Sequence, residues 1–220
     1  MRGVFVTGTD THVGKTVVCA ALMHRLRPES AVRYWKPVQT GIEQDDDTGA
    51  VRVLGDCGPG EIHESGVRLP HPLSPHLAAR LAGRTIDVGA LLADVPAGAT
   101  GTQTVRWIVE GAGGALVPLN DEQLMIDLMT RVSAPVLVVA RTALGTINHT
   151  LLTLDALRCR QLVVAGVVMV GDRSRDNRAA IERFGGVPVL GEMPRLEPLT
   201  PDAIRTWAVR ELDPEGLLRP

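Results

Sequence analysis

The chain has 220 residues, 45% of them apolar and 22% charged, which is typical of a folded globular protein and excludes a disordered or fibrous chain. Its 23 Lys and Arg residues nearly balance 25 Asp and Glu residues, and the net charge of −2 gives no basic excess of the kind that nucleic acids or anionic membranes attract. Three Trp, one Tyr and two Phe are too few for a platform that stacks single-stranded bases.

Apolar runs alternate with helical patterns along the chain. Strands are expected at 3–7, 32–38, 105–109, 135–140, 162–170 and 187–190, and helices at about 16–27, 122–132, 146–158, 174–184 and 201–211. The strand segments are continuous Val, Leu and Ala runs, which indicates that helices cover both faces of the sheet. The sequence therefore predicts an α/β fold with a mostly parallel sheet flanked by helices on both faces.

The segment 41–104 is less regular than the rest. It holds the acidic run Asp45–Asp47, Gly- and Pro-rich stretches and two expected helices near 75–83 and 87–95. We expect it to cover the carboxyl edge of the sheet, where open α/β sheets bind ligands. Because no repeat or linker interrupts the pattern, residues 1–220 are expected to form one domain.

Three features bear on the compartment of the protein. Cys19, Cys57 and Cys159 are widely spaced and form no CxxC pair, which favours free thiols in a reducing environment. The longest apolar stretch, 162–170, is about half the roughly 20 residues that a membrane span needs. The apolar segment 3–6 is too short for the core of a signal peptide. We expect a cytoplasmic protein that does not enter a membrane.

The strongest local motif is GTDTHVGKT at residues 8–16, between the first expected strand and the first expected helix. In a phosphate-binding loop, backbone N–H groups and the helix dipole face the phosphates, Gly14 lets them approach, and Lys15 adds a positive charge. The Thr16 hydroxyl can bind Mg²⁺. Five residues separate Gly8 from Gly14, one more than usual. A tight turn with a chance Gly-Lys-Thr is the alternative, but the strand and helix around the motif favour a P-loop NTPase fold.

Glu110 and Lys36 stand at the ends of expected strands. Glu110 precedes a Gly-rich turn and could hold Mg²⁺ beside the phosphate loop, or it could simply end the strand. Lys36 precedes Pro37 and could neutralise charge during phosphoryl transfer, or it could face solvent. In the loop that follows, Thr40 could bind a polar substrate.

Two further segments have a chemical interpretation. Of the three acids Asp45–Asp47, at most one is expected to contact magnesium. The segment 144–149 precedes a helical pattern, with Thr146 as the expected N-cap, and such a helix start can bind a carboxylate. His149 on its own is better explained as a structural residue.

Taken together, these segments resemble the dethiobiotin synthetases, which catalyse the penultimate step of biotin synthesis. The similar segments occur in the family's order over nearly the whole chain: TGTDTHVGKT (7–16), KPVQTG (36–41), SPH (74–76), VEGAGG (109–114), LGTINH (144–149) and GEMP (191–194). The resemblance implies an ATP- and Mg²⁺-dependent ring closure. Carbon dioxide adds to one amine of 7,8-diaminononanoate, ATP phosphorylates the carbamate, and the second amine displaces phosphate.

The resemblance also implies roles for individual residues. Lys15 and Lys36 would bind the phosphates and the carbamate, with Thr11 near the γ-phosphate. Thr16, Asp47 and Glu110 would hold Mg²⁺; Asp47 is chosen because 48–54 resembles the helix after the family's metal aspartate. The nucleotide would contact His12, Val13, Gly14, Lys15, Thr16, Val17, Asp47, Glu110, Gly111, Ala112, Gly113, Gly171, Asp172, Pro194, Arg195 and Leu196. Substrate would contact Thr40 and, across a homodimer interface, Gly145, Thr146, Ile147 and Asn148 of a second subunit.

Three positions depart from the family pattern. His12 stands where an acid or glycine is frequent, Gly171-Asp172 where Asn and an acid recognise adenine, and Arg195 follows Pro194 in the second base-contact loop. The departures predict relaxed selectivity among nucleoside triphosphates. Two alternatives share the nucleotide fold. Cobyrinic-acid amidating enzymes need a glutaminase domain for which 220 residues leave no room. Partitioning ATPases, which act as nucleotide-switched binding proteins, carry an extra loop lysine where this chain has Thr9 and Asp10.

Overall fold

The computed structural model describes residues 1–95 and 105–218 and is built around a seven-stranded sheet. Every pair of neighbouring strands in this sheet is parallel. The spatial order is β4 (Ile62–His63), β2 (Val32–Trp35), β6 (Arg106–Gly114), β1 (Gly3–Gly8), β7 (Val136–Arg141), β8 (Val164–Val170) and β9 (Val189–Met193). The expectation of a mostly parallel α/β sheet is confirmed.

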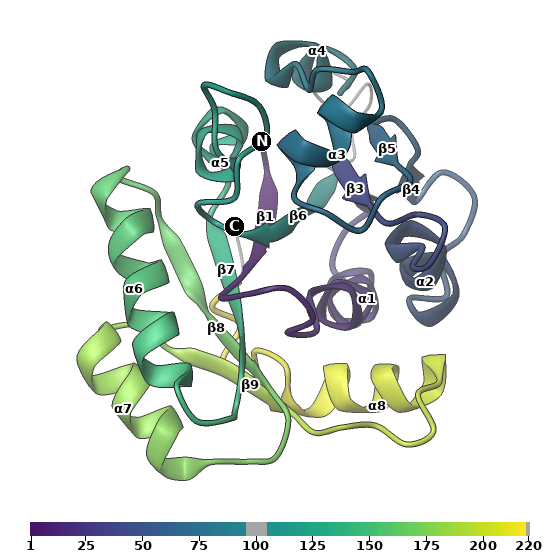
Figure 1. The fold of residues 1–220 in the computed structure, drawn as a ribbon. Coiled ribbons are helices and arrows are strands. Elements are labelled where there is room, and N and C mark those ends of the chain that lie inside the picture. The colour runs from purple at the N-terminus through teal and green to yellow at the C-terminus, as the bar shows by residue number, and fades with distance from the viewer. Residues whose placement is uncertain (96–104, 219–220) are drawn as a thin grey trace.

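Helices cover both faces of this sheet (Figure 1). One face carries α1 (Lys15–Leu26), α2 (Asp47–Leu54) and α8 (Pro201–Glu211), and the other carries α3 (Pro75–Leu81), α4 (Val88–Ala93), α5 (Met125–Val132), α6 (Thr146–Cys159) and α7 (Arg175–Gly185). Side chains alternate along β1, so Val4 and Val6 join the α1 core whereas Phe5 joins the other. Burial on both faces explains why the strand segments are continuously apolar.

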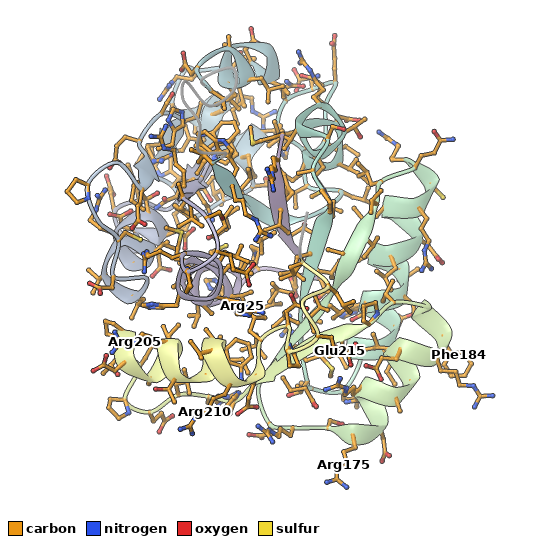
Figure 2. All side chains as sticks on the ribbon, turned by 180° about the vertical axis from the view of Figure 1, so that it is seen from behind. Arg25, Arg175, Phe184, Arg205, Arg210 and Glu215 are labelled. Carbon is orange, nitrogen blue, oxygen red and sulfur yellow. The ribbon has the colours of Figure 1, made fainter. Side chains whose placement is uncertain are left out.

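Side chains tie the end of α8 to α1. Arg25 reaches from α1 and donates from Nε to the carbonyl of Leu212 and from Nη2 to that of Asp213, both over 3.1 Å (Figure 2). The Thr200 hydroxyl caps the start of α8 by accepting the N–H of Ala203. The carboxyl-terminal helix is thereby fixed beneath the helix that carries the P-loop lysine.

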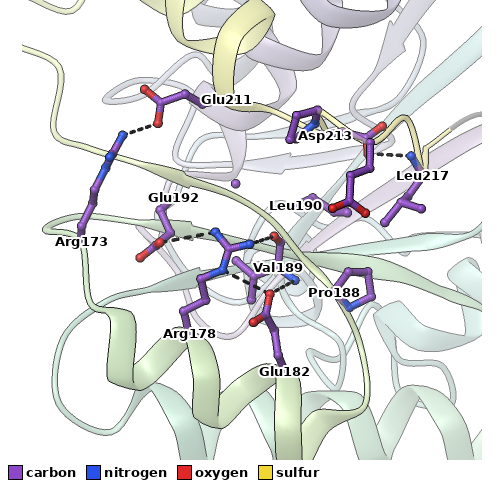
Figure 3. A pocket seen from close by; sticks show the side chains of 13 residues that line it. Arg173, Arg178, Glu182, Pro188, Val189, Leu190, Glu192, Glu211, Asp213 and Leu217 are labelled. Carbon is purple, nitrogen blue, oxygen red and sulfur yellow. Dashed lines mark hydrogen bonds and ion pairs between the residues drawn. The ribbon is translucent and has the colours of Figure 1, made fainter.

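The free edge of β9 is covered by charged side chains from α7 (Figure 3). Val189 donates its N–H to Glu182 over 3.2 Å, and its carbonyl accepts from Arg178 over 3.0 Å. These side chains line a cavity of about 320 Å³, and Arg173 pairs with Glu211 across it. Because these side chains pair with each other and hydrogen-bond to the backbone of the edge strand, they protect the sheet against edge-to-edge pairing. None of the site residues expected from the sequence lines it.

The structure corrects several expected boundaries. The strand expected at 32–38 ends at Trp35, because Pro37 has no N–H for the ladder, and the chain continues as β3 (Val38–Thr40). β3 pairs with β5 (Val67–Leu69) in a separate two-stranded sheet. β6 continues past the expected residue 109 to Gly114, which lies in register with Gly8. No helix of the described residues is long and apolar enough to span a membrane.

Candidate active site

The candidate site lies at the carboxyl ends of β1, β6 and β2, which are neighbours in the sheet. In the register of the strands, Val6 is level with Glu110 and Trp35 with Val109. Lys36, the residue after β2, therefore comes beside Glu110. Parallel pairing thus brings three sequence-distant segments together: the P-loop, the Lys36 segment and the Glu110 segment.

The P-loop turns sharply into α1. His12 and Gly14 adopt left-handed backbone conformations, with φ of 53° and 97°. A Cβ on Gly14 would lie 3.1 Å from a methyl group of Val170, so the loop is packed closely against the end of β8. The Lys15 side chain is buried, and its ammonium donates to the carbonyl of Asp10 over 3.0 Å. Thr11 and His12 are exposed on the outside of the loop, whereas Val13 is buried.

The predicted metal ligands do converge. The Thr16 hydroxyl lies 2.8 Å from Oδ1 of Asp47 and 3.1 Å from Oε1 of Glu110. Asp47 is the first residue of α2, and the resemblance expected a helix at this point. Of the acidic run Asp45–Asp47, it is Asp47 that contacts both Thr16 and Lys36.

Lys36 forms the centre of this cluster. Its ammonium lies 2.5 Å from Oδ2 of Asp47 and 2.6 Å from Oε1 of Glu110. The side chains of Lys36 and Glu110 are 3% and 0% exposed, which rules out the solvent-facing interpretation of Lys36. Two carboxylates and one ammonium thus form a hydrogen-bonded group in which each charge has a partner; Lys36 and Glu110 are buried, and Asp47 is 29% exposed.

The charges shift one another's titration. Burial opposes the charged form of Lys36, but Glu110 and Asp47 outweigh it and raise the pKa of this ammonium. Burial also opposes the charged form of Asp47, but Lys36 outweighs it and lowers the pKa of that carboxyl. Burial, and then the charge of Lys36, lower the pKa of Lys15. At neutral pH Lys36 is therefore a cation.

The donor set suits magnesium. Among the described residues no group of three or more His, Cys, Asp or Glu side chains could hold a metal. What the site offers is two carboxylates and a hydroxyl, all oxygen donors, beside a phosphate-binding loop. Mg²⁺ is commonly held by one or two carboxylates together with substrate phosphates and water. The residues Thr16, Asp47 and Glu110 fit this pattern.

The two segments expected to contact the base lie next to each other. Gly171 follows β8 and donates its N–H to the carbonyl of Met193, at the end of β9, over 2.9 Å. Pro194 and Arg195 follow directly. Val170, which touches the P-loop glycine, links this region to the phosphate site. The two segments predicted to contact the nucleotide base thus lie together, next to the P-loop.

The residues expected to bind substrate are not together within one chain. Thr40 ends β3, beside α3, whereas residues 145–148 begin α6 beyond β1 and β7 (Figure 1). The expected N-cap is wrong: α6 is capped by Gly145 at φ 93°, and Thr146 is its first residue, buried and without a hydrogen-bond partner for its hydroxyl among the described residues. The left-handed turn, which glycine adopts readily, moves the cap one position back.

A groove of about 380 Å³ joins the start of the P-loop to α6. It is lined by residues of the loop and of the end of β6, and by the α6 side chains of His149 and Leu152. Leu144 and Leu152 are strongly exposed, with 104% and 60% of their reference surfaces accessible. Leu152 of α6 therefore places an exposed apolar side chain in the groove beside the phosphate loop, and Leu144 is exposed just before this helix.

One residue of the cluster was not expected from the sequence. The Tyr34 hydroxyl donates to Oε2 of Glu110 over 2.8 Å, and both side chains are fully buried. The available signal was its spacing: Tyr34 lies two residues before Lys36, and side chains two apart in a strand share a face. Cys19 on α1 is buried, as its helical spacing indicates.

Comparison with known proteins identifies the family. A protein-family model described as an AAA domain matches residues 2–203. The chain is 51% identical over 201 residues to an ATP-dependent dethiobiotin synthetase of Paramagnetospirillum magneticum, covering 91% of each protein. It is 46% identical to the synthetase of Agrobacterium fabrum, covering 90% of this chain and 89% of that one. This chain belongs to the dethiobiotin synthetase family. It is an enzyme of the ATP-dependent ligase class.

Solved structures show the fold alone. The septum site-determining protein MinD of Pyrococcus horikoshii, complexed with Mg-ADP, matches with a TM-score of 0.57 and 13% identity over 99% of this chain and 93% of that one. The cell division protein FtsY of Thermotoga maritima matches with a TM-score of 0.53 and 16% identity over 96% of this chain and 69% of that one. The P-loop NTPase fold is confirmed. The alternative of a partitioning-class ATPase is not favoured, because proteins of that kind share the fold but little sequence.

Proposed function

We propose that this enzyme closes the ureido ring of dethiobiotin on 7,8-diaminononanoate, using carbon dioxide and a nucleoside triphosphate. One amine adds to carbon dioxide and loses a proton, giving a carbamate. A carbamate oxygen attacks the γ-phosphorus and the nucleoside diphosphate leaves. The second amine attacks the carbonyl carbon, the ring closes and orthophosphate departs. The phosphorylation is needed because a carbamate oxygen is by itself a poor leaving group.

The observation that carries this proposal is the contact of the buried Lys36 with Asp47 and with the buried Glu110 beside the P-loop. Such a reaction needs positioning and stabilisation of charge rather than a nucleophilic side chain. Because the pKa of Lys36 is raised, its ammonium is protonated and can neutralise the carbamate and the transferred phosphoryl group. Lys15 would bind the outer phosphates of the nucleotide, and Thr11 would lie near the γ-phosphate.

Thr16, Asp47 and Glu110 would hold Mg²⁺. When bound, the ion supplies charge neutralisation at the phosphates and orients them for in-line transfer. The chain's own contribution is to keep the Thr16 hydroxyl within hydrogen-bonding distance of both carboxylates before nucleotide arrives. This pre-organisation lowers the cost of assembling the site.

We propose that the base is held by residues 171–172 and 194–196, with relaxed selectivity. Gly171 has φ 130°, and a Cβ there would lie 2.5 Å from the Thr142 hydroxyl. No side-chain amide can therefore read the base from this position without a local shift. We expect kcat/KM for CTP and GTP to lie within about tenfold of that for ATP, which is 1.4 kcal/mol. A strict preference for ATP in competing-nucleotide assays would refute relaxed selectivity.

We also propose a homodimer in which residues 145–148 of one subunit bind the carboxylate of substrate held at the other subunit's site. The separation of Thr40 from the start of α6 within one chain supports it, as do the exposed Leu152 of α6 and Leu144 just before that helix. The α6 N-terminus carries a positive partial charge that suits a carboxylate. We infer a cytoplasmic location, where nucleotide is available and the three free cysteines remain reduced.

Release of orthophosphate tests the reaction. The complete mixture contains 7,8-diaminononanoate, bicarbonate, Mg²⁺ and ATP, and each component is omitted in turn. We expect release to require all four, with the mass of dethiobiotin in the product. Phosphate release that is independent of the diamine, with no ring product, would contradict the proposal and favour a nucleotide-switched ATPase. The variant Glu110→Gln tests whether any release depends on this site.

A further inference from the structure

The two carboxylate oxygens of Glu110 have different partners. Oε1 lies 2.6 Å from the Lys36 ammonium and 3.1 Å from the Thr16 hydroxyl, within the group expected to meet phosphate and metal. Oε2 accepts the hydrogen bond of the Tyr34 hydroxyl over 2.8 Å. The carboxylate therefore has one oxygen directed at the site and one held away from it.

The fold fixes Tyr34 in this place. Tyr34 is level with Ile108 in the β2–β6 pairing, so it lies one side-chain step before Glu110 on the neighbouring strand. Its ring belongs to the apolar core on the α1 face and is 0% exposed. A ring packed in this way has little freedom, so its hydroxyl stays within hydrogen-bonding distance of Oε2.

The chemistry of the pair matches an orienting role. The phenol hydroxyl can donate a hydrogen bond, whereas an ionised carboxylate oxygen such as Oε2 can only accept one. Without this donor, Oε2 would lose the hydrogen bond from Tyr34, and the orientation of the carboxylate would depend on the contacts of Oε1 with Lys36 and Thr16. Hydrogen-bonded partners of metal ligands typically contribute 10- to 100-fold to metal affinity.

We propose that Tyr34 is a positioning residue for the metal site: it holds Oε2 of Glu110 so that Oε1 stays directed at the bound metal ion. This inference rests on the proposed role of Glu110 as a magnesium ligand. Tyr34 does not touch phosphate or substrate, and acts only through the carboxylate.

The test is the affinity for Mn²⁺ in the presence of ADP, measured by electron paramagnetic resonance of the free ion. Tyr34→Phe keeps the ring and removes the hydroxyl. We expect Mn²⁺ to bind about 10- to 100-fold more weakly to this variant. We expect the Mg²⁺ concentration needed for half-maximal activity to rise by a similar factor, with kcat at saturating Mg²⁺ within about threefold of wild type. Thr130→Val, which removes a hydroxyl hydrogen bond from an exposed residue of α5 outside the candidate site, is the control for a general loss of stability.

A second readout uses the composition of the chain. Tyr34 is the one tyrosine, so incorporation of 3-fluorotyrosine gives a single ¹⁹F resonance. We expect this resonance to shift when Mg²⁺ is added with ADP, and the shift to be lost in Glu110→Gln. It reports on the hydrogen bond without any turnover and needs no variant of Tyr34.

The outcomes separate the inference from the function on which it rests. If wild type binds Mn²⁺, Glu110→Gln does not, and Tyr34→Phe binds as wild type does, the positioning role of Tyr34 is wrong and the proposed metal site stands. If Glu110→Gln binds Mn²⁺ as tightly as wild type, the proposed metal site itself fails. If Thr130→Val loses as much affinity as Tyr34→Phe, the effect is a general loss of stability and the inference is overturned.

Discussion

At the scale of single residues, Lys36 carries the charge balance of the site. Its ammonium neutralises Asp47 and Glu110, the carboxylates expected to bind Mg²⁺, and in the proposed reaction it would also neutralise the transferred phosphoryl group. A cation in this place competes with a divalent ion for the same oxygens but stabilises the anionic reaction. Lys36 is therefore expected to weaken metal binding and to accelerate the reaction at the same time.

The substitution Lys36→Met separates the two effects. We expect kcat to fall about 10²- to 10³-fold, as for the loss of one charge-stabilising donor. We expect Mn²⁺ to bind more tightly in the absence of nucleotide, because the competing ammonium is gone. Isothermal titration with Mn²⁺ and steady-state kinetics check the two arms. Metal binding unchanged or weaker in Lys36→Met would contradict the competition.

A partly buried histidine is expected to make the stability of the fold sensitive to pH. The His63 ring lies between Trp35 and Trp107, with centroid distances of 5.9 and 5.5 Å, and its Nε2 has no partner among the described residues. Burial, and then the charge of Arg33, lower the pKa of His63 below its usual value. The folded state therefore binds fewer protons than the unfolded state in this range.

The contribution of His63 to the free energy of unfolding should thus decrease as the pH falls from about 6.5 toward the lower pKa of the folded state. Above a pH of about 6.5 this contribution should not change. Urea unfolding at pH 7.5, 6.5 and 5.5 measures it. His63→Phe keeps an aromatic ring between the indoles, and we expect a shallower loss of stability at acid pH. A variant that loses stability as steeply as wild type would exclude His63 as a source; His24, whose pKa burial also lowers, would then account for it.

At the scale of elements, the P-loop is positioned by one glycine. Gly14 has φ 97°, and a Cβ added there would lie 3.1 Å from a methyl group of Val170. Gly83 has φ 64°, and a Cβ added there would have no atom within 4 Å. An alanine at either position takes a left-handed conformation that costs about 1–2 kcal/mol. At Gly14, but not at Gly83, the close contact of the added methyl group with Val170 at the end of β8 increases this cost.

Gly14→Ala and Gly83→Ala therefore form a matched pair. We expect each to lower the free energy of unfolding by about 1–2 kcal/mol, with the larger loss at Gly14. We expect nucleotide affinity, measured by fluorescent ADP titration, to fall at least tenfold in Gly14→Ala and to be unchanged in Gly83→Ala. Equal nucleotide affinity in the two variants would show that the backbone at Gly14 does not position the loop.

The main strands and helices were predictable from sequence because burial on both faces leaves long apolar runs, as at β7 and β8. β4, β5 and the break between β2 and β3 were not, since strands of two or three residues leave no periodic pattern. The P-loop, Lys36, Asp47 and Glu110 were predicted from motifs. Tyr34 was not, because its partner lies 76 positions away and only the strand register brings them together.

At the scale of the whole molecule, the exposed apolar surface beside the P-loop supports the proposed dimer. Leu144 and Leu152 expose more surface than buried neighbours on α6 such as Leu154 and Leu157. Exposed leucines next to a groove at the site are explained if a second subunit covers them. On this account each site is incomplete in a monomer.

Leu152→Asp tests the dimer, with Leu81→Asp as its control, because the two leucines are 60% and 58% exposed but lie on different helices. We expect Leu152→Asp to shift the sedimentation coefficient to that of a monomer and to abolish turnover. Leu81→Asp should remain dimeric and active. In a dilution series of wild type, activity per chain should fall as the dimer dissociates; constant activity per chain would contradict a site shared between subunits.

The most direct test of the proposed reaction follows oxygen atoms from C¹⁸O₂. The carbamate carries two labelled oxygens, one of which attacks phosphorus while the other remains on carbon. We predict one ¹⁸O in the released phosphate and one in the ring carbonyl of dethiobiotin, measured by mass spectrometry after a turnover fast enough to precede exchange with water. Dethiobiotin formed together with unlabelled phosphate would contradict the phosphorylated carbamate, and with it the role assigned to Lys36 and the metal site.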